Sequence, residues 1–139
     1  MKTYQPTQKD IKRFWHLIDA KGEVLGRLSS QIVNLLMGKQ KAGYSRHIDC
    51  GDFVVVVNAE KVKVTGRKES QKTYKSHSGY PGWFKEIPFT QMIREHPESV
   101  IEHSVAGMLP NNRLKQKRMS RLKLVVGDKN PYEERMKNG

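Results

Sequence analysis

The segment FVVVV at residues 53–57 restricts the possible folds of this chain more than any other stretch. It is a continuous apolar run, mostly of β-branched residues, and it lacks the apolar–polar alternation of a strand that has one face in water. Such runs are typical of parallel sheets, whose strands are covered on both faces. We therefore predict a doubly covered strand here, and an α/β fold built on a mostly parallel sheet.

The segments on either side of this run fit the same architecture. FWHLID at residues 14–19 reads as a short strand, and residues 25–36 carry leucine and isoleucine at helical spacing up to Gly38, a plausible left-handed cap. A second helix is expected to begin at Pro97. Its predicted buried stripe is Val100, Ile101, Val105 and Met108. LKLVV at residues 122–126 reads as a last buried strand.

The remaining segments are shorter or less regular. Val62 and Val64 alternate with lysines and predict a short strand, residues 88–94 a short helix, and residues 111–121 a basic helix. Residues 66–87 show no regular period. The chain has 139 residues without an internal repeat or a linker, so we predict one domain, 1–139, with a polar N-terminal arm at 1–13 and a polar tail at 128–139.

Positive charge is the main compositional signal. The chain has 26 Lys and Arg against 14 Asp and Glu, a formal net charge of +12. Because like charges repel in a compact state, this excess favours a polyanionic partner, nucleic acid first and an acidic membrane surface second. The lone Cys50 excludes an internal disulfide and favours a reducing compartment. The polar start and the lack of a run of about 20 apolar residues predict neither a signal peptide nor a membrane helix.

The basic residues form three clusters. Residues 61–85 hold seven basic residues against one acid, residues 111–123 hold six against none, and Lys39, Lys41 and Arg46 form a smaller group with His47. A single charge run is usually a solvated face, but three runs with almost no acids favour nucleic acid, since Lys and Arg displace counterions from phosphates.

Aromatic residues are interleaved with one of these clusters in KSHSGYPGWFK, residues 75–85. Rings in such a loop either stack on unpaired bases or pin the loop to its own core. For Trp83 and Phe84 we predict the core role, and for Tyr74, His77 and Tyr80 a base or sugar contact. Gly79 and Gly82 permit the turns.

Enzyme motifs are absent from the sequence. There is no G-x-S-x-G, no G-x-x-x-x-G-K-[ST] and no G-x-G-x-x-G after a strand. Asp49 and Asp52 flank Cys50, but neighbours in sequence do not make a catalytic triad. One cysteine and scattered histidines make no dependable zinc site. We predict no enzyme, no cofactor, no metal and no small-molecule substrate, with Cys50 a small buried residue.

Several longer motifs resemble the bacterial-type large-subunit ribosomal protein L13 family. They are GDFVVVVNAEKVKVTGRK at 51–68, HSGYPG at 77–82, W-x-x-I-D-A-x-G-x-x-L-G-R-L at 15–28, G-K-x-K at 38–41 and A-G-M-L-P-x-N-x-L at 106–114. The resemblance runs from about residue 2 to residue 127. The chain departs from the family pattern at Arg46, Trp83, Lys115-Gln116 and Asn130-Pro131-Tyr132, where the family commonly has Pro, Gly, Gly-Arg and His-Pro-His.

The resemblance implies a three-layer α/β/α domain that belongs to the large ribosomal subunit. It implies a structural constituent of the cytoplasmic ribosome, with an organellar ribosome as the alternative, that binds large-subunit ribosomal RNA, lies beside other large-subunit proteins at one copy per ribosome, joins early in assembly and supports translation. The charge clusters then supply the expected phosphate contacts, some of which we expect to face solvent instead: Lys39, Lys41, Arg46, Lys61, Lys63, Arg67, Lys68, Lys72, Lys75, Arg113, Lys115, Lys117, Arg118 and Arg121. If so, changing Arg118 and Arg121 to alanine weakens RNA binding and leaves the Tm nearly unchanged.

Two other classes of protein remain open from the residues alone. The same basic surface would serve a free-standing RNA-binding regulator that acts, for example, on messenger RNA. A small α/β enzyme with a nucleotide substrate would need a glycine loop that cradles phosphate, and the sequence has none.

Overall fold

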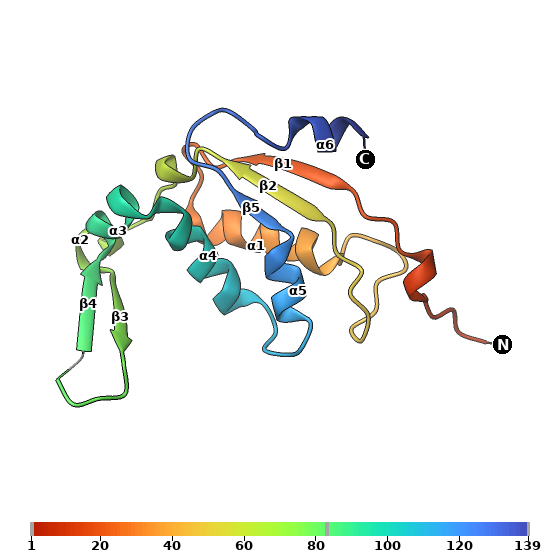
Figure 1. Cartoon of the computed structure of the whole chain (residues 1–139), viewed down its shortest axis with the longest axis horizontal. Helices are drawn as coiled ribbons and strands as arrows, with labels where there is room; N and C mark the ends of the chain where they lie inside the picture. Colours follow the sequence, from red (N-terminus) through yellow and green to blue (C-terminus); the bar gives the residue numbers. More distant parts are fainter. Residues whose placement is uncertain (1, 83, 139) are drawn as a thin grey trace.

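Three parallel strands form the main sheet (Figure 1). The computed structural model describes residues 2–82 and 84–138. β1 (Trp15–Asp19), β2 (Phe53–Val57) and β5 (Leu122–Leu124) lie in the order β1-β2-β5, and both neighbouring pairs are parallel. The four valines of β2 are buried, because this middle strand has a layer on each face. The α/β fold and the mostly parallel sheet predicted from the valine run are confirmed.

One face of the sheet is covered by α1 (Leu25–Met37) and α4 (Pro97–Met108), which pack against each other. The connections from β1 to β2 and from β2 to β5 both move across the sheet in the same direction. Because parallel crossovers are right-handed, both connecting helices then lie on the same face. Their apolar stripes form the core with Val54 and Val56. Gly38 ends α1 at a φ of 77°, the left-handed cap expected from the sequence.

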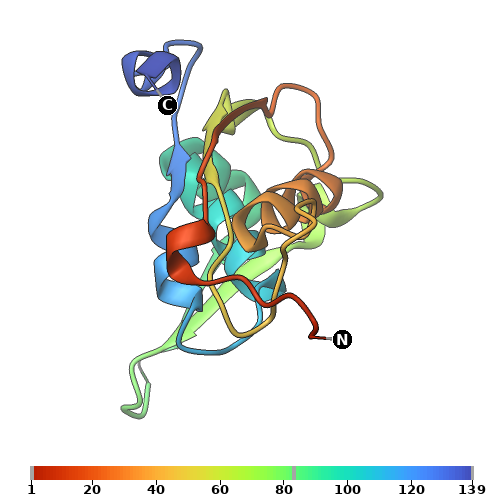
Figure 2. The same ribbon diagram turned by 90° about the vertical axis from the view of Figure 1, so that its right-hand side faces the viewer.

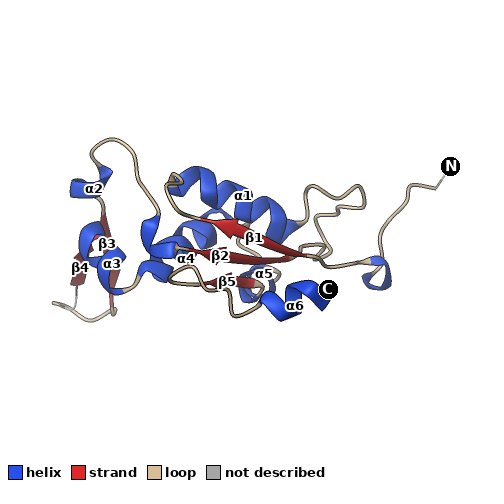
Figure 3. Ribbon diagram, turned by 90° about the horizontal axis from the view of Figure 1, so that it is seen from above, coloured by secondary structure: helices blue, strands red, loops and turns tan. Residues whose placement is uncertain are grey.

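The C-terminal segment supplies the layer on the opposite face (Figures 1 and 3). After β5 the chain turns back, and α6 (Glu133–Asn138) lies above the sheet in Figure 1 and on the β5 side of it in Figure 3. Trp15 stacks on Phe53, with 4.4 Å between ring centroids, and on Tyr132 at 6.1 Å. The three layers expected from the resemblance are therefore present.

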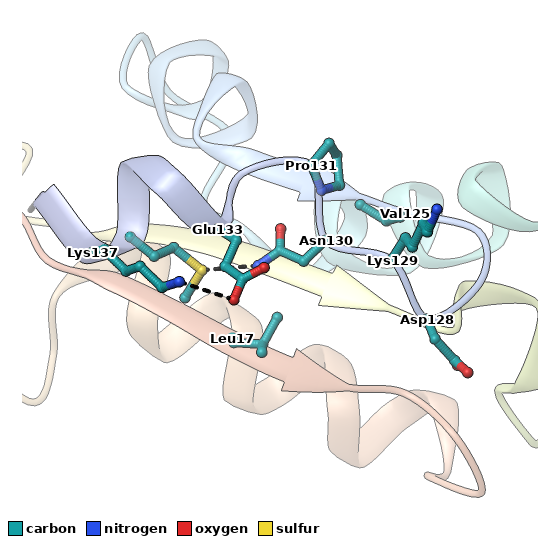
Figure 4. Close-up of a pocket in the computed structure, with 9 residues that line it drawn as sticks. Leu17, Val125, Asp128, Lys129, Asn130, Pro131, Glu133 and Lys137 are labelled. Atoms are coloured by element: carbon teal, nitrogen blue, oxygen red, sulfur yellow. Dashed lines mark hydrogen bonds and ion pairs between the residues drawn. The ribbon is translucent and has the colours of Figure 1, made fainter.

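This third layer is thin. Figure 4 shows α6 above the sheet, with Leu17 of β1 pointing up toward it. A cavity of about 920 Å³ remains between them, and Leu17 is 52% exposed. The visible polar contacts stay within the segment, such as the ion pair between Lys137 and Glu133 at 3.4 Å.

A hairpin projects from the rest of the molecule (Figures 1 and 2). After α2 (Lys68–Gln71), β3 (Thr73–His77) pairs with antiparallel β4 (Phe84–Pro88), which leads into α3 (Phe89–Glu95). The expectation that residues 66–87 lack regular structure was wrong. The described residues between 75 and 86 are all exposed, so the outer parts of these strands bury no apolar face and leave no alternating pattern in the sequence.

Several element boundaries also differ from the expectations. The predicted strand at 62–64 is only a single bridge between Val24 and Lys63 after η2 (Ala59–Lys61). Met108 is 44% exposed rather than buried, because it lies in the last turn of α4 beyond the packed stripe. α5 spans only Lys115–Ser120, β5 ends before the exposed Val126, and α6 was not anticipated within the polar tail. η1 (Gln8–Asp10) is the only element described within the arm at residues 2–13.

Candidate nucleic-acid interface

Most of the exposed basic residues of the three sequence clusters fall into two groups on the folded chain. The first, which we call the hairpin surface, consists of exposed cations on the chain from η2 to β3, the segment that leads into the hairpin: Lys61, Lys63, Arg67, Lys68 and Lys75. The second, which we call the loop surface, consists of exposed cations on the segments after α1 and before and within α5: Lys39, Arg46, Arg113 and Lys117. Two of the three sequence clusters therefore meet in space, because Lys39, Arg46 and Asn112 line one cavity.

Arg121 does not belong to either surface. Its side chain is 7% exposed, and its guanidinium makes a bidentate contact with the carboxylate of Asp49. The same group donates to the backbone carbonyl of Leu36 at 3.0 Å and approaches that of Asp52 at 3.4 Å. The prediction of an Arg121–phosphate contact is therefore wrong, because the donors are already used inside the fold.

Arg118 is buried as well. Its side chain is 1% exposed and its Nε lies 4.0 Å from the Asp49 carboxylate. The expectation that alanine at Arg118 and Arg121 leaves the Tm unchanged is wrong for this pair of substitutions, because both side chains are buried. Both side chains are inside the protein, so truncation to alanine leaves a cavity at either position, and at Arg121 it also breaks the buried ion pair with Asp49.

Lys41 has a structural role beside this pair. Its Nζ lies 2.6 Å from the carboxylate of Asp52 and donates to the backbone carbonyls of Lys12 and Cys50 at 2.6 and 2.8 Å. The same carboxylate contacts His16 Nε2 at 2.8 Å. Lys41 is thus held by acceptors of the chain itself, which corrects its assignment as a phosphate contact.

The two aspartates of this network are held in their charged form. Burial alone would raise the pKa of Asp49, but the hydrogen bonds and charge of Arg121, with the charge of Arg13, outweigh it and lower that pKa. Burial alone would also raise the pKa of Asp52, but hydrogen bonds from Lys41 and His16 outweigh this effect and lower that pKa. Both carboxylates therefore stay ionised inside the protein.

Two participants of the network were missed in the sequence. Arg13, in the supposed arm, donates to the carbonyls of Gly51 at 2.6 Å and Asp49 at 3.0 Å. Gly51 has no room for a side chain, since a Cβ would lie 1.6 Å from the Leu36 carbonyl oxygen. One feature of the sequence could have indicated this network. Asp49 and Asp52, with Gly51 between them, are the first acids after a long stretch that contains none.

Tyr74 also turns inward. Its ring meets His103 of α4 edge-on at 5.3 Å, and its hydroxyl is buried without a hydrogen-bond partner among the described residues. Burial raises the pKa of this hydroxyl. The half-buried Lys72 covers the ring, with Nζ 5.5 Å from its centroid, and burial lowers the pKa of Lys72. Tyr74 therefore fixes the hairpin to α4, and its assignment as a base contact was wrong.

The tip of the hairpin is open to a partner. Tyr80 is 70% exposed in a turn between Gly79 and Gly82, both at positive φ. His77 is exposed, with Nδ1 accepting from the Gly79 amide at 2.9 Å. Phe84 is 54% exposed, so the prediction that it is a core residue was wrong, and Trp83 lies outside the described residues.

Comparison with known proteins identifies the family. The family model for Ribosomal protein L13 matches residues 13–131. Curated relatives named "Large ribosomal subunit protein uL13" include those of Maridesulfovibrio salexigens, 51% identical over 95% of this chain and 93% of the relative, and Roseiflexus castenholzii, 49% identical over 95% and 90%. That of Thermoanaerobacter sp. strain X514 is 48% identical over 96% and 93%.

The chain belongs to the ribosomal protein L13 family. This confirms the resemblance found in the sequence, and with it the prediction of a ribosomal structural protein rather than an enzyme. Among residues 2–82 and 84–138, no helix is long and apolar enough to cross a membrane, and no group of three or more His, Cys, Asp and Glu residues could hold a metal ion.

The match to the L13 family covers the elements that build the network. Residues 13–131 contain all three sheet strands, α1, α4, α5 and the Asp49–Arg121 pair, and Cys50 is buried among them as predicted. Most of the N-terminal arm and α6 lie outside this span. The L13 domain therefore contains a buried ionic centre that positions the loop surface around it.

Proposed function

We propose that this L13-family chain binds large-subunit ribosomal RNA through the hairpin surface and the loop surface, as a structural constituent that joins the subunit early in its assembly. The observation that carries this proposal is the presence of exposed cations on two parts of the fold, while Asp49 and Asp52, the acids beside the loop surface, are paired internally with Arg121 and Lys41. Lysine and arginine arranged in this way contact phosphates, and such contacts position a protein on RNA by shape.

The hairpin suits a folded RNA partner. It extends from the main sheet with the exposed Lys75 on β3 and an exposed tyrosine at its tip, so it reaches a second contact region away from the loop surface (Figure 1). Aromatic rings of this kind stack on unpaired bases. Lys115 is half-buried at the start of α5 and adds to the positive potential of the loop surface.

Salt-dependent binding of the full chain to a large-subunit rRNA transcript tests the proposal. With six to ten phosphate contacts, we expect the affinity to fall by roughly 10³–10⁵ between 50 and 200 mM salt. The double variants Lys68→Gln/Lys75→Gln and Arg113→Gln/Lys117→Gln should each reduce the slope of log affinity against log salt by about one for each phosphate that is no longer bound. The matched control is Lys129→Gln/Lys137→Gln in the C-terminal segment, which removes the same charge and should change the slope little.

An affinity that ignores salt, or an equal reduction of the slope in the control, would refute the assignment. Sedimentation of a cell extract then decides between a ribosomal constituent and a free-standing regulator. We expect one copy per large subunit, beside neighbouring large-subunit proteins in the cytoplasmic ribosome. Protein that sediments apart from large subunits would favour the regulator.

A further inference from the structure

Arg118 is a buried arginine whose hydrogen-bonding groups are unused. Its Nε, Nη1 and Nη2 have no hydrogen-bond partner in the part of the chain that the structure describes. The 4.0 Å between Nε and Asp49 Oδ1 is too long for a hydrogen bond. Since nearly all buried polar groups have a partner, an unpaired guanidinium indicates that something outside the chain completes it.

The charge around Arg118 points to an anion. Three guanidinium groups, from Arg13, Arg118 and Arg121, lie within 4.0 Å of the single carboxylate of Asp49. Arg121 takes both oxygens of that carboxylate, and Asp52 is already matched by Lys41. One negative charge therefore faces three positive ones, and an uncompensated buried charge is costly until a counter-charge arrives.

A cavity beside Arg118 has the composition to receive such a group. It measures about 400 Å³, and its polar lining includes Arg118, Lys39, Arg46 and Asn112, with no acidic residue among the described residues that line it. These residues come from the segment after α1, the loop before α5 and α5 itself. The space far exceeds the roughly 30 Å³ of one water molecule.

We propose that this cavity is an oxyanion site that takes one phosphate group of the bound RNA, with Arg118 as the residue that recognises it. Arginine suits this task because its planar donors match two phosphate oxygens at once. The exposed Lys39 and Arg46 attract the phosphate and close over it. The proposal rests on the proposed RNA binding and adds to it one deep contact at a defined place on the loop surface.

Thermal unfolding of the full chain in sodium phosphate and in sodium chloride, at equal ionic strength, tests the site without RNA. Phosphate should raise the Tm of the wild type, because it binds the folded state. Arg118→Met should bind phosphate about ten- to a hundredfold more weakly, as expected for one charge-assisted hydrogen-bonding group. In chloride its Tm should equal or exceed that of the wild type, because a buried charge without a hydrogen-bond partner among the described residues has been removed. Arg94→Met, at an exposed arginine on α3 away from the cavity, is the control and should keep the phosphate effect.

Equal Tm values of the wild type in phosphate and chloride would overturn the proposal, as would a full phosphate effect in Arg118→Met. If Arg118→Met does not fold, Lys39→Gln/Arg46→Gln replaces it, because both side chains are exposed. This double variant must lose phosphate affinity, and an unchanged affinity would equally refute the site.

Binding to the rRNA transcript shows where the phosphate comes from. At constant ionic strength, inorganic phosphate should compete with RNA on the wild type and not on Arg118→Met. If RNA binds but phosphate neither competes nor stabilises, the oxyanion site is wrong and the proposed function stands. If phosphate stabilises through Arg118 but the transcript does not bind, the site takes a free oxyanion and the proposed function is wrong.

Discussion

Replacing Arg121 by alanine should destabilise the chain strongly, although the sequence places this arginine in a basic run. The substitution removes the bidentate partner of Asp49 and leaves the carbonyl of Leu36 without its donor, both in the interior. The Asp49 side chain is only 10% exposed, so water cannot take the place of the guanidinium. What remains near the carboxylate is Arg13 at 3.8 Å and Arg118 at 4.0 Å.

The expected magnitude follows from this arrangement. Removing one partner of a buried ion pair costs about 3–5 kcal/mol, and two remaining arginines place this case near 3 kcal/mol. The unfolding entropy is about 2.1 cal/mol/K per residue, so for a chain of 139 residues that destabilisation lowers the Tm by about 10 °C. The total stability of such a domain is about 5–15 kcal/mol, so the variant still folds at low temperature.

Calorimetry and urea unfolding of the full chain measure this effect. Arg94→Ala is the matched control, since it removes an exposed arginine and should shift the Tm by little. Asp49→Asn, made alone and together with Arg121→Ala, completes a double-mutant cycle. We expect the double variant to be clearly more stable than the sum of the two single effects predicts, because the two side chains act as one pair. A Tm within about 2 °C of the wild type, or strictly additive effects, would refute the reasoning.

Four further predictions rest on the same structure. Because the pKa values of Asp49 and Asp52 are lowered on folding, their contribution to stability is complete above the unfolded value of about 3.9 and is lost as the pH falls through the folded values. Circular dichroism melts should therefore show the Tm dropping below about pH 4, and a flat profile there would contradict this. Tyr74→Phe removes a hydroxyl that has no described partner and should leave the Tm and RNA affinity unchanged, whereas Tyr80→Ala should cost about 1–3 kcal/mol of RNA affinity in a filter-binding assay and no stability. Gly51→Ala should prevent stable folding, because its Cβ would lie 1.6 Å from the Leu36 carbonyl oxygen, and native-like circular dichroism of this variant would count against that geometry.

The elements that the sequence predicted well are those whose burial leaves a pattern. The valines of β2, the helical spacing in α1 and the start of α4 at Pro97 were found because each element packs against the core along one stripe or on both faces. The hairpin was missed for the converse reason, since the outer parts of β3 and β4 are exposed on both sides. The bridge between Val24 and Lys63 involves a single residue on each side, so it leaves no periodic pattern of apolar residues in the sequence.

The candidate interface was predictable as a region and not residue by residue. The order of the residues showed three clusters of cations, and exposed members such as Lys68 and Lys117 remain proposed phosphate contacts. The sequence could not show that Arg121 meets Asp49, because these two residues lie 72 positions apart along the chain. A side chain has the same local sequence whether it faces water or a buried carboxylate.

The sequence alone determined the fold class and the family, since these depend on local periodicity and ordered motifs, and its net charge indicated the sign of charge to expect on a partner. Only the tertiary structure decided which cations are available to that partner. The parallel sheet brings the segment after α1, the Asp49–Asp52 turn and α5 together. Arg121 and Lys41 thereby become internal counter-charges, while Arg118 has no hydrogen-bond partner among the described residues. Pairing of charges depends on distances across the fold, and those distances exist only once the chain has closed around its core.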